Sequence, residues 1–413
     1  MALARSDAEA LDRGDPLAHY RDEFVIEDES LIYLDGNSLG MLPRATRDKV
    51  RQVLEDEWGR QLIRSWDDRW VDLPHQLGDL IGTSLLGARP GETIVGDSTT
   101  VALYKAISAA LDARPGRRVI VIERDNFPTD RYVVESLARQ RDLEIRWIAE
   151  AGPDGIELVA LGAVLDESVA VVVLSQVDYR SAALLDLGSY TDAIHTVGAL
   201  TVWDLCHSAG SVPIDLTGDC VDIAVGCTYK YLNGGPGAPA YTYVRAELQG
   251  ELRQPIWGWW GRADMFDMEQ GYEAQPDMRA WLTGTPSVLS LCAVEPGVSM
   301  IAEATVTAVR AKSEALTALA VQLYDEVLAP AGYVLATSRD PRRRGSHVTV
   351  THPDARRLIR ELLGVGVVVD YRRPDGVRLG LAPLTTRFVD VHDAFAHMSA
   401  IAVASTRSDL SPA

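Results

Sequence analysis

The segment Gly226-Cys227-Thr228-Tyr229-Lys230-Tyr231-Leu232-Asn233-Gly234-Gly235-Pro236-Gly237 places a lysine between an apolar run, residues 221–225, and a glycine-rich turn. The apolar run has the length and composition of a buried strand. A lysine carries a strongly hydrated charge, so its position at the end of such a strand is unusual. We interpret Lys230 as a lysine that forms an imine with an aldehyde cofactor. The alternative is a lysine that extends its ammonium group into solvent, which is the commoner fate.

The composition indicates a globular protein of two or three domains. The chain has 413 residues, of which 47% are hydrophobic and 24% charged, and a net charge of −19. This acidity argues against nucleic-acid partners and anionic membrane surfaces, because both require basic patches. The N-terminus lacks a secretory signal, and no run reaches the ~18 apolar residues of a membrane helix. Four cysteines and eight histidines without metal-binding spacing predict a reduced, cytoplasmic protein with no metal site.

The middle of the chain alternates between predicted strands and helices. The predicted strands cover residues 93–96, 118–123, 144–148, 169–175, 199–204 and 221–225. Strands separated by helices favour an α/β fold, a mostly parallel sheet with helices on both faces. Residues 249–290 read as long loops, and a single helix over about 299–327 leads into a small α+β unit. We predict an N-terminal arm (1–60), a large domain (61–295) and a small C-terminal domain (296–413).

Four loops follow predicted strands, where ligands bind in open parallel sheets. They are Asp97-Ser98-Thr99-Thr100, Asn126-Phe127-Pro128-Thr129-Asp130, Trp203-Asp204-Leu205-Cys206-His207-Ser208-Ala209-Gly210 and Tyr229-Lys230. The first opens a predicted helix and suits a phosphate, although simple helix capping is an alternative. The second offers an aromatic ring and a carboxylate to a flat cofactor. The third places Asp204 where it can pair with a protonated pyridine nitrogen or cap a helix. Together these groups predict a pyridoxal 5′-phosphate site.

At these motifs, and at Tyr33-Leu34-Asp35-Gly36-Asn37-Ser38-Leu39-Gly40 and Gly376-Val377-Arg378-Leu379-Gly380-Leu381-Ala382-Pro383-Leu384, the sequence resembles the fold-type I, aspartate aminotransferase-like pyridoxal-phosphate enzymes. More narrowly, it resembles the kynureninase family. The resemblance extends over about residues 31–388. It implies a large domain with a mainly parallel seven-stranded sheet, a small α+β C-terminal domain and an N-terminal arm that packs on the small domain.

The resemblance also implies an activity, the hydrolysis of L-kynurenine to anthranilate and L-alanine in tryptophan breakdown or NAD biosynthesis. Lys230 is then the Schiff-base lysine, Asp204 the partner of the pyridine nitrogen and Tyr229 the candidate proton donor. The implied cofactor-binding residues are Thr99, Thr100, Phe127, Asp130, Ser175, Asp204, His207, Tyr229, Lys230, Trp259 and Thr285. The implied substrate-binding residues are Ser38, Trp66, Gly284 and Arg378. Trp259 and Thr285 match family positions that reach the neighbouring subunit's cofactor, which implies a homodimer with shared active sites.

Several alternatives remain open from the sequence. The substrate is L-kynurenine if Trp66 and Gly284-Thr285 form an apolar ring pocket, because a pocket with bonding groups selects for an extra hydroxyl. Trp66 can instead be a core residue, and the substrate can be 3-hydroxykynurenine or another modified kynurenine. A non-catalytic binding protein on the same fold requires a lost lysine or an added module, and neither is present. A dinucleotide-dependent oxidoreductase lacks its Gly-x-Gly-x-x-Gly turn.

Overall fold

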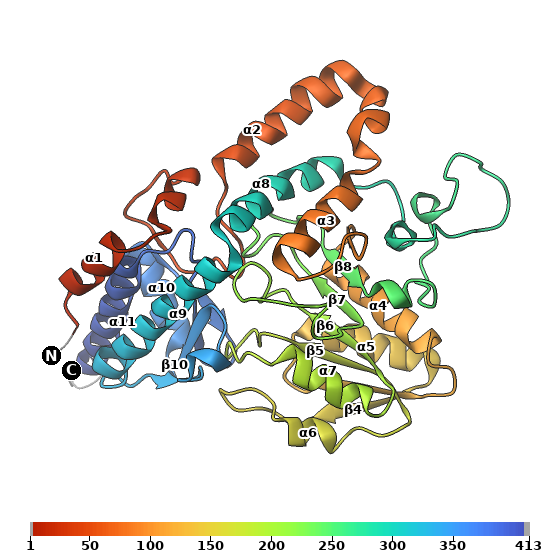
Figure 1. Ribbon diagram of the computed structural model, residues 1–413. Helices are drawn as coiled ribbons and strands as arrows, with labels where there is room; N and C mark the ends of the chain where they lie inside the picture. Colours follow the sequence, from red (N-terminus) through yellow and green to blue (C-terminus); the bar gives the residue numbers. More distant parts are fainter. Residues whose placement is uncertain (1–2, 409–413) are drawn as a thin grey trace.

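The computed structural model describes residues 3–408, which form two lobes joined by long helices (Figure 1). The larger lobe contains a seven-stranded sheet in the order β2-β8-β7-β6-β5-β3-β4. Its strands are β2 (Thr93–Val95), β3 (Val119–Glu123), β4 (Glu144–Ile148), β5 (Val169–Ser175), β6 (Leu200–Asp204), β7 (Ile223–Gly226) and β8 (Tyr241–Val244). The sheet confirms the predicted α/β class with its mainly parallel sheet.

Strand β8 was not predicted, and it changes the edge of the sheet. It lies between β2 and β7 and is antiparallel to both. The signal was present, because Tyr241-Thr242-Tyr243-Val244 consists only of aromatic and β-branched residues, which favour strands. Because β8 is antiparallel to β7, no helix is needed to connect the two strands. The alternation of strands and helices on which the prediction was based therefore ends at β7.

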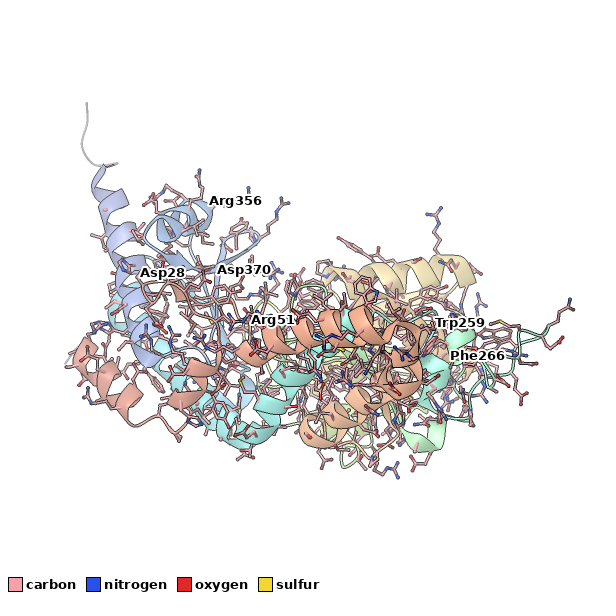
Figure 2. The ribbon with its side chains drawn as sticks, turned by 90° about the horizontal axis from the view of Figure 1, so that it is seen from above. Asp28, Arg51, Trp259, Phe266, Arg356 and Asp370 are labelled. Carbon is pink, nitrogen blue, oxygen red and sulfur yellow. The ribbon has the colours of Figure 1, made fainter. Side chains whose placement is uncertain are left out.

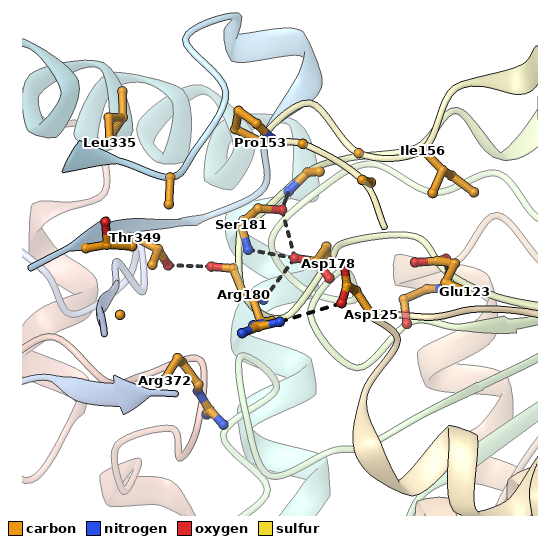
Figure 3. A pocket seen from close by; sticks show the side chains of 18 of the residues that line it. Glu123, Asp125, Pro153, Ile156, Asp178, Arg180, Ser181, Leu335, Thr349 and Arg372 are labelled. Carbon is orange, nitrogen blue, oxygen red and sulfur yellow. Dashed lines mark hydrogen bonds and ion pairs between the residues drawn. The ribbon is translucent and has the colours of Figure 1, made fainter. Parts of the chain in front are cut away.

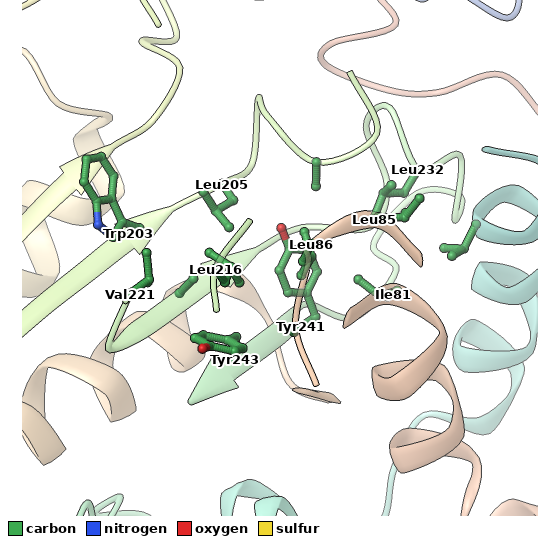
Figure 4. Packing of buried hydrophobic residues seen from close by; sticks show 14 of the residues in the cluster. Ile81, Leu85, Leu86, Trp203, Leu205, Leu216, Val221, Leu232, Tyr241 and Tyr243 are labelled. Carbon is green, nitrogen blue, oxygen red and sulfur yellow. The ribbon is translucent and has the colours of Figure 1, made fainter. Parts of the chain in front are cut away.

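Helices cover both faces of the large sheet. They are α3 (Leu73–Leu85), α4 (Thr99–Asp112), α5 (Pro128–Arg141), α6 (Leu158–Gly162) and α7 (Leu187–His195), with α2 (Arg44–Gln52) and α8 (Val288–Ala304) on the outside of α3. Successive residues of β5 join different cores, because Val172 belongs to the core that includes residues of α3 and α7 whereas Val171 belongs to the core that includes residues of α4 and α5. This two-sided burial explains the unbroken apolar run of β5. Figure 4 shows Tyr241 beside Leu86 and near Ile81 of α3, with Tyr243 in the same cluster.

The smaller lobe is built mainly from the C-terminal third of the chain. Its antiparallel sheet has the order β12-β13-β10-β9. The elements of this lobe are α9 (Val306–Leu323), β9 (Val334–Leu335), β10 (His347–Thr351), α10 (Ala355–Gly364), β11 (Val367–Val368), β12 (Asp370–Arg372), β13 (Gly376–Gly380) and α11 (Phe388–Ser408). The N-terminal segment joins it through α1 (Arg5–Arg13) against α11 and through β1 (Ile32–Tyr33), which pairs in parallel with β11. Ala8 and Leu34 belong to the core of this lobe.

The predicted single helix over residues 299–327 was wrong. Helix α8 ends at Ala304, and the chain turns by 82° before α9 begins at Val306. Thr305 makes the turn with a φ of 64°, in the left-handed region that β-branched residues rarely adopt, and its side chain caps α9 by accepting from the Ala308 amide.

The division of the chain at residues 60/61 and 295/296 stays a prediction, and α8 runs through the second of these positions. Residues 1, 2 and 409–413 of the predicted arm and small domain lie outside the described residues. Among residues 3–408, no single helix is long and apolar enough to cross a membrane, and α8 and α9 pass that test only as a sharply bent pair.

Candidate active site

Lys230 lies in a buried cluster just after β7. Its side chain is inside the protein, with the residue only 9% exposed, so it is not the solvated lysine of the alternative interpretation. Its Nζ lies 3.4 Å from Nε2 of His207 and 5.8 Å from the centre of the Phe127 ring. The Tyr229 ring lies on another side, with its centre 5.9 Å away. Three of the predicted cofactor-binding side chains therefore surround the lysine.

The N-terminal motif Asp35–Gly40 packs directly on the Lys230 loop. The Gly40 amide donates to the Tyr229 carbonyl at 2.8 Å. A β-carbon at Gly40 would lie 2.4 Å from the Lys230 carbonyl oxygen and 2.3 Å from Oδ1 of Asn233, so only glycine permits this approach. Two of the motifs that carried the family resemblance therefore form one structural unit around the lysine.

Two buried carboxylates lie at the same end of the sheet. The strand register places Asp204 between Ser175 of β5 and Val225 of β7. Asp204 accepts a hydrogen bond from the Cys206 amide at 2.7 Å. Asp130, at the start of α5, has a buried Oδ2 that lacks a partner among the described residues. Burial, followed by the neighbouring Asp204, raises the pKa of Asp130 well above its usual range. One protonated nitrogen between these groups would satisfy them, which fits the pyridine ring of pyridoxal phosphate.

The N-terminus of α4 faces the same region, and the hydroxyls of Thr99 and Thr100 are not part of its cap. Ser98 is the helix cap, and its Oγ accepts from the Val101 amide. Asp97 instead pairs with the buried Lys105 and accepts from Thr283. Thr99 Oγ1 lies 4.0 Å from Sγ of Cys206, beside Asp204, and Thr100 is exposed in the first turn. Because neither threonine is used as the cap, the helix start retains amides and hydroxyls for a phosphate.

Ser175 and Phe127 are held by a network beside the lysine. Ser175 Oγ donates to Oδ1 of Asn126 at 3.0 Å, and its amide donates to Oε1 of Glu123 at 3.3 Å. The Phe127 ring meets Tyr179 edge to face at 5.2 Å. Glu123 and Ser175 also line a cavity of about 300 Å³ between the lobes, where Figure 3 shows Glu123 beside Asp125 and Asp178.

The predicted substrate-binding Arg378 is fully buried on β13. Its Nη2 donates to Oγ of Ser38 at 2.7 Å and to Oδ2 of Asp370 at 2.6 Å, and its Nη1 donates to the Tyr179 carbonyl at 2.8 Å. Its Nη1 also lies 3.4 Å from Nε2 of His207. The Arg378 guanidinium therefore connects the N-terminal motif, the large lobe and the histidine beside Lys230.

His207 and His347 are uncharged at neutral pH. Burial, with Lys230 and Arg378 as the next causes, lowers the pKa of His207 well below its usual range. Burial followed by Arg378 does the same to His347, whose ring centre lies 5.7 Å from that of His207. Sequence reasoning missed His347, Asp370 and Glu123. Only the strand order brings these residues to the site, and their local sequence carries no signal for it.

A second group of predicted residues lies elsewhere in this chain. Trp66 packs on Trp70 and Trp260 at ring distances of 5.2 and 5.1 Å, and it lines a cavity of about 410 Å³ together with Thr285. Gly284 and Trp259 are exposed, and Figure 2 shows Trp259 beside Phe266 at one end of the molecule. Within residues 3–408, none of Trp66, Trp259, Gly284 and Thr285 shares a hydrogen bond or ring contact with the Lys230 cluster.

Comparisons with known proteins agree with this geometry. Residues 309–398 match the family model "Kynureninase C-terminal domain". The chain is 44% identical to Kynureninase from Burkholderia pseudomallei over 399 residues, 94% of this chain and 93% of that protein. It is 43% identical to Kynureninase from Pseudomonas fluorescens, with the same coverage of both chains.

Solved structures of more distant proteins share the fold. The apo cysteine desulfurase of Thermococcus onnurineus superposes with a TM-score of 0.78 at 16% identity, over 98% of this chain and 100% of that one. The cystine C-S lyase C-DES in complex with its product cysteine persulfide gives 0.79 at 16% identity, over 90% of this chain and 98% of that one. These two comparisons concern the fold alone. The two curated relatives decide the family, and the chain belongs to the kynureninase family.

Proposed function

We propose that this protein is a pyridoxal-phosphate-dependent hydrolase that cleaves L-kynurenine to anthranilate and L-alanine. Its relatives named Kynureninase support this activity over nearly their whole length. The observation that carries the proposal is the convergence of a buried lysine, a pair of buried carboxylates and a buried arginine at one end of the sheet. A lysine and an arginine suit an amino-acid substrate, because one reacts with an aldehyde and the other pairs with a carboxylate.

The residues present fit the cofactor. Asp204 would hold its ring nitrogen, with His207 close by, and Asp130 and Ser175 would contact the polar edge of the ring. Phe127 would stack on the ring. Thr99, Thr100 and Tyr229 would hold its phosphate at the start of α4. Lys230 would bind its aldehyde carbon. Bound pyridoxal phosphate supplies an electron sink that stabilises negative charge on the amino-acid substrate.

The side chains around this site have separate tasks in the reaction. Arg378 and Ser38 hold the substrate carboxylate. Lys230 would transfer protons at the substrate α-carbon, and burial lowers the pKa of the neighbouring His207, so that no second cation lies on that side of Lys230. Burial raises the pKa of Tyr229, so its phenol is protonated at neutral pH and can donate to the β-carbon after cleavage.

We further propose a homodimer in which Trp259 and Thr285 of one subunit complete the site of the other. The support is a set of large apolar side chains that are exposed within residues 58–63 and 257–268, namely Trp58, Leu62, Ile63, Trp257, Trp259, Phe266 and Met268. Trp259 meets Phe266 at a ring distance of 6.2 Å, and Trp58 lines the same cavity as Thr285. Exposed apolar side chains that lie together are typical of an interface. Mixing Lys230→Ala subunits with Trp259→Ala subunits tests it, because a shared site regains activity in mixed dimers and separate sites do not.

We place the protein in the cytoplasm and favour L-kynurenine over 3-hydroxykynurenine. All four cysteines are free, and Cys206, Cys227 and Cys292 are buried, which suits a reducing compartment. Trp66 and Thr285 line one largely apolar cavity, which suits an unsubstituted aniline ring.

The central experiment combines a spectrum with an assay. The purified protein is expected to show a visible cofactor band that borohydride removes, and Lys230→Ala is expected to lack it. Adding L-kynurenine is expected to release anthranilate, followed by its fluorescence, with an equal amount of L-alanine. A wild-type protein that shows the band but releases no anthranilate contradicts the proposed substrate. A wild-type protein without the band contradicts the cofactor.

A further inference from the structure

The Arg378 guanidinium has no free donor for a substrate carboxylate. Arginine offers five N–H donors. The two on Nη2 bind Ser38 and Asp370, and one on Nη1 binds the Tyr179 carbonyl while the other faces His207. The remaining Nε–H donates to the Asn37 side-chain oxygen at 3.2 Å when the amide is oriented to satisfy both of its atoms. A ligand carboxylate therefore has to displace at least one partner.

Asp370 is the partner that can leave. Tyr179 contributes a backbone carbonyl, and Asn37 is fully buried against Gly380. Asp370 is 21% exposed and lies on the short edge strand β12, directly opposite Arg378 in the register of the hairpin. Figure 2 shows Asp370 on the C-terminal lobe. Among the described residues, Asp370 is also the only one whose carboxylate lies within hydrogen-bonding distance of the Arg378 guanidinium. Oδ1 of Asp35 lies 3.9 Å from Nη2 of Arg378, which is too far for a hydrogen bond.

A second arginine is ready to receive the Asp370 carboxylate. Arg372 already pairs with Asp370 through its Nη2, and both arginines share the same oxygen, Oδ2. The Nε of Arg372 is buried and has no hydrogen-bond partner among the described residues. A small rotation of Asp370 would therefore form a two-bond pair with Nε and Nη2 of Arg372, which is the preferred carboxylate geometry. The guanidinium of Arg372 is packed over the Tyr179 ring at 5.6 Å, which fixes its plane.

We propose that Asp370 is an internal carboxylate that occupies the Nη2 edge of Arg378 until a ligand carboxylate arrives and then transfers to Arg372. The proposal rests on the proposed function, because it takes Arg378 as the group that binds the substrate carboxylate. Asp370 prevents the buried guanidinium from standing unpaired, and it competes with the ligand. Asp370 and Arg372 are therefore positioning residues that set affinity for the carboxylate of the substrate.

The first test replaces Asp370 with asparagine and measures equilibrium binding to the holoenzyme by the change in cofactor absorbance. The probes are L-alanine and L-alaninamide, which differ only in the carboxylate. Asparagine keeps the shape and an acceptor oxygen but not the charge, so the Kd for L-alanine is expected to fall about fivefold. The Kd for L-alaninamide is expected to change less than twofold. For L-kynurenine, KM is expected to fall without a rise in kcat.

Asp375→Asn is the matched control, because Asp375 lies in the same hairpin and its side chain makes no hydrogen bond or ion pair with any residue that the structure describes. It removes the same charge and is expected to leave both Kd values unchanged. An unchanged or higher Kd for L-alanine in Asp370→Asn overturns the proposal, because Asp370 then supports Arg378 and does not compete for it. An equal effect in Asp375→Asn also overturns it, because the cause is then the general charge of the lobe.

The second test removes the receiving cation with Arg372→Gln. Asp370 then has only Arg378 as a cationic partner, so the Kd for L-alanine is expected to rise about fivefold. In the Asp370→Asn background, Arg372→Gln is expected to have no effect, since the two residues act through one another. If Arg372→Gln weakens binding equally in both backgrounds, Arg372 contacts the ligand itself and the transfer does not occur. Failure of the proposed function is distinct, because the wild-type protein then lacks the cofactor band or releases no anthranilate from L-kynurenine, whatever the Kd values of the variants.

Discussion

Replacing Glu123 with glutamine is expected to change how the stability of this protein depends on pH. Glu123 is 7% exposed at the end of β3, and it accepts a hydrogen bond from the Ser175 amide. Burial, followed by the nearby Asp178 carboxylate, raises the pKa of Glu123 from its ordinary 4.5 to about 8. The folded protein therefore keeps a proton that the unfolded chain has lost between these values. Wild-type stability should fall as the pH rises through this window.

The magnitude follows from the two pKa values. The difference between 4.5 and about 8 corresponds to about 5 kcal/mol of lost stability, at about 1.4 kcal/mol for each pH unit. Glutamine does not titrate, and its carbonyl oxygen can still accept from the Ser175 amide. The advantage of Glu123→Gln over the wild type should therefore be small at pH 5 and should grow until about pH 8.

Thermal unfolding of the holoenzyme at several pH values measures this difference. The Tm difference between Glu123→Gln and wild type is expected to increase by several degrees between pH 5 and pH 8.5. Glu135→Gln is the matched control, because Glu135 is exposed on α5 and its replacement should give a constant, small difference. A Tm difference for Glu123→Gln that stays constant over this range would refute the reasoning, because Glu123 is then charged at neutral pH.

Three further substitutions test the site. Gly40→Ala places a β-carbon 2.4 Å from the Lys230 carbonyl oxygen, so it is expected to cost about 2 kcal/mol or more of stability by thermal unfolding. Gly250→Ala, which enters open space, should be neutral, and equal effects would contradict the packing argument. Trp66→His adds a bonding group to the ring pocket and is expected to shift the ratio of kcat/KM toward 3-hydroxykynurenine by about tenfold; an unchanged ratio assigns Trp66 to packing. Tyr229→Phe is expected to slow L-alanine formation about 10²-fold, and a normal rate would exclude Tyr229 as the proton donor.

The sequence predicted every strand of the large sheet except β8, because each of these strands carries its own signal. The bounds of β4 and β5 were predicted to the residue, since both are bordered by polar turns. The bend between α8 and α9 could not be predicted in the same way. Thr305 stands in a run of helix-compatible residues, and only its left-handed conformation in the folded chain ends the helix.

The residues of the candidate site likewise fall into those that have a local sequence signal and those that have none. Asp204, Phe127 and Lys230 follow strands, so the rule that ligands bind at the carboxyl ends of parallel strands indicated them directly. Asp370 and Glu123 could not be found, because an edge-strand aspartate and a strand-end glutamate are common on protein surfaces. Their importance depends on which distant residue packs beside them, and that information is absent from any local window of sequence.

The pairing of β1 with β11 has a consequence for how the chain is made. Ser38 binds Arg378, which lies 340 residues further along the chain, and Leu34 contributes, together with Ala8, to a core otherwise made of residues after 315. During synthesis the N-terminal motif emerges from the ribosome first and has no C-terminal partner until almost the whole protein has been translated. Such long-range closure slows folding and leaves early intermediates with unpaired segments. The active site is therefore completed at the end of translation, and nascent chains released before about residue 380 are expected to need chaperones or degradation.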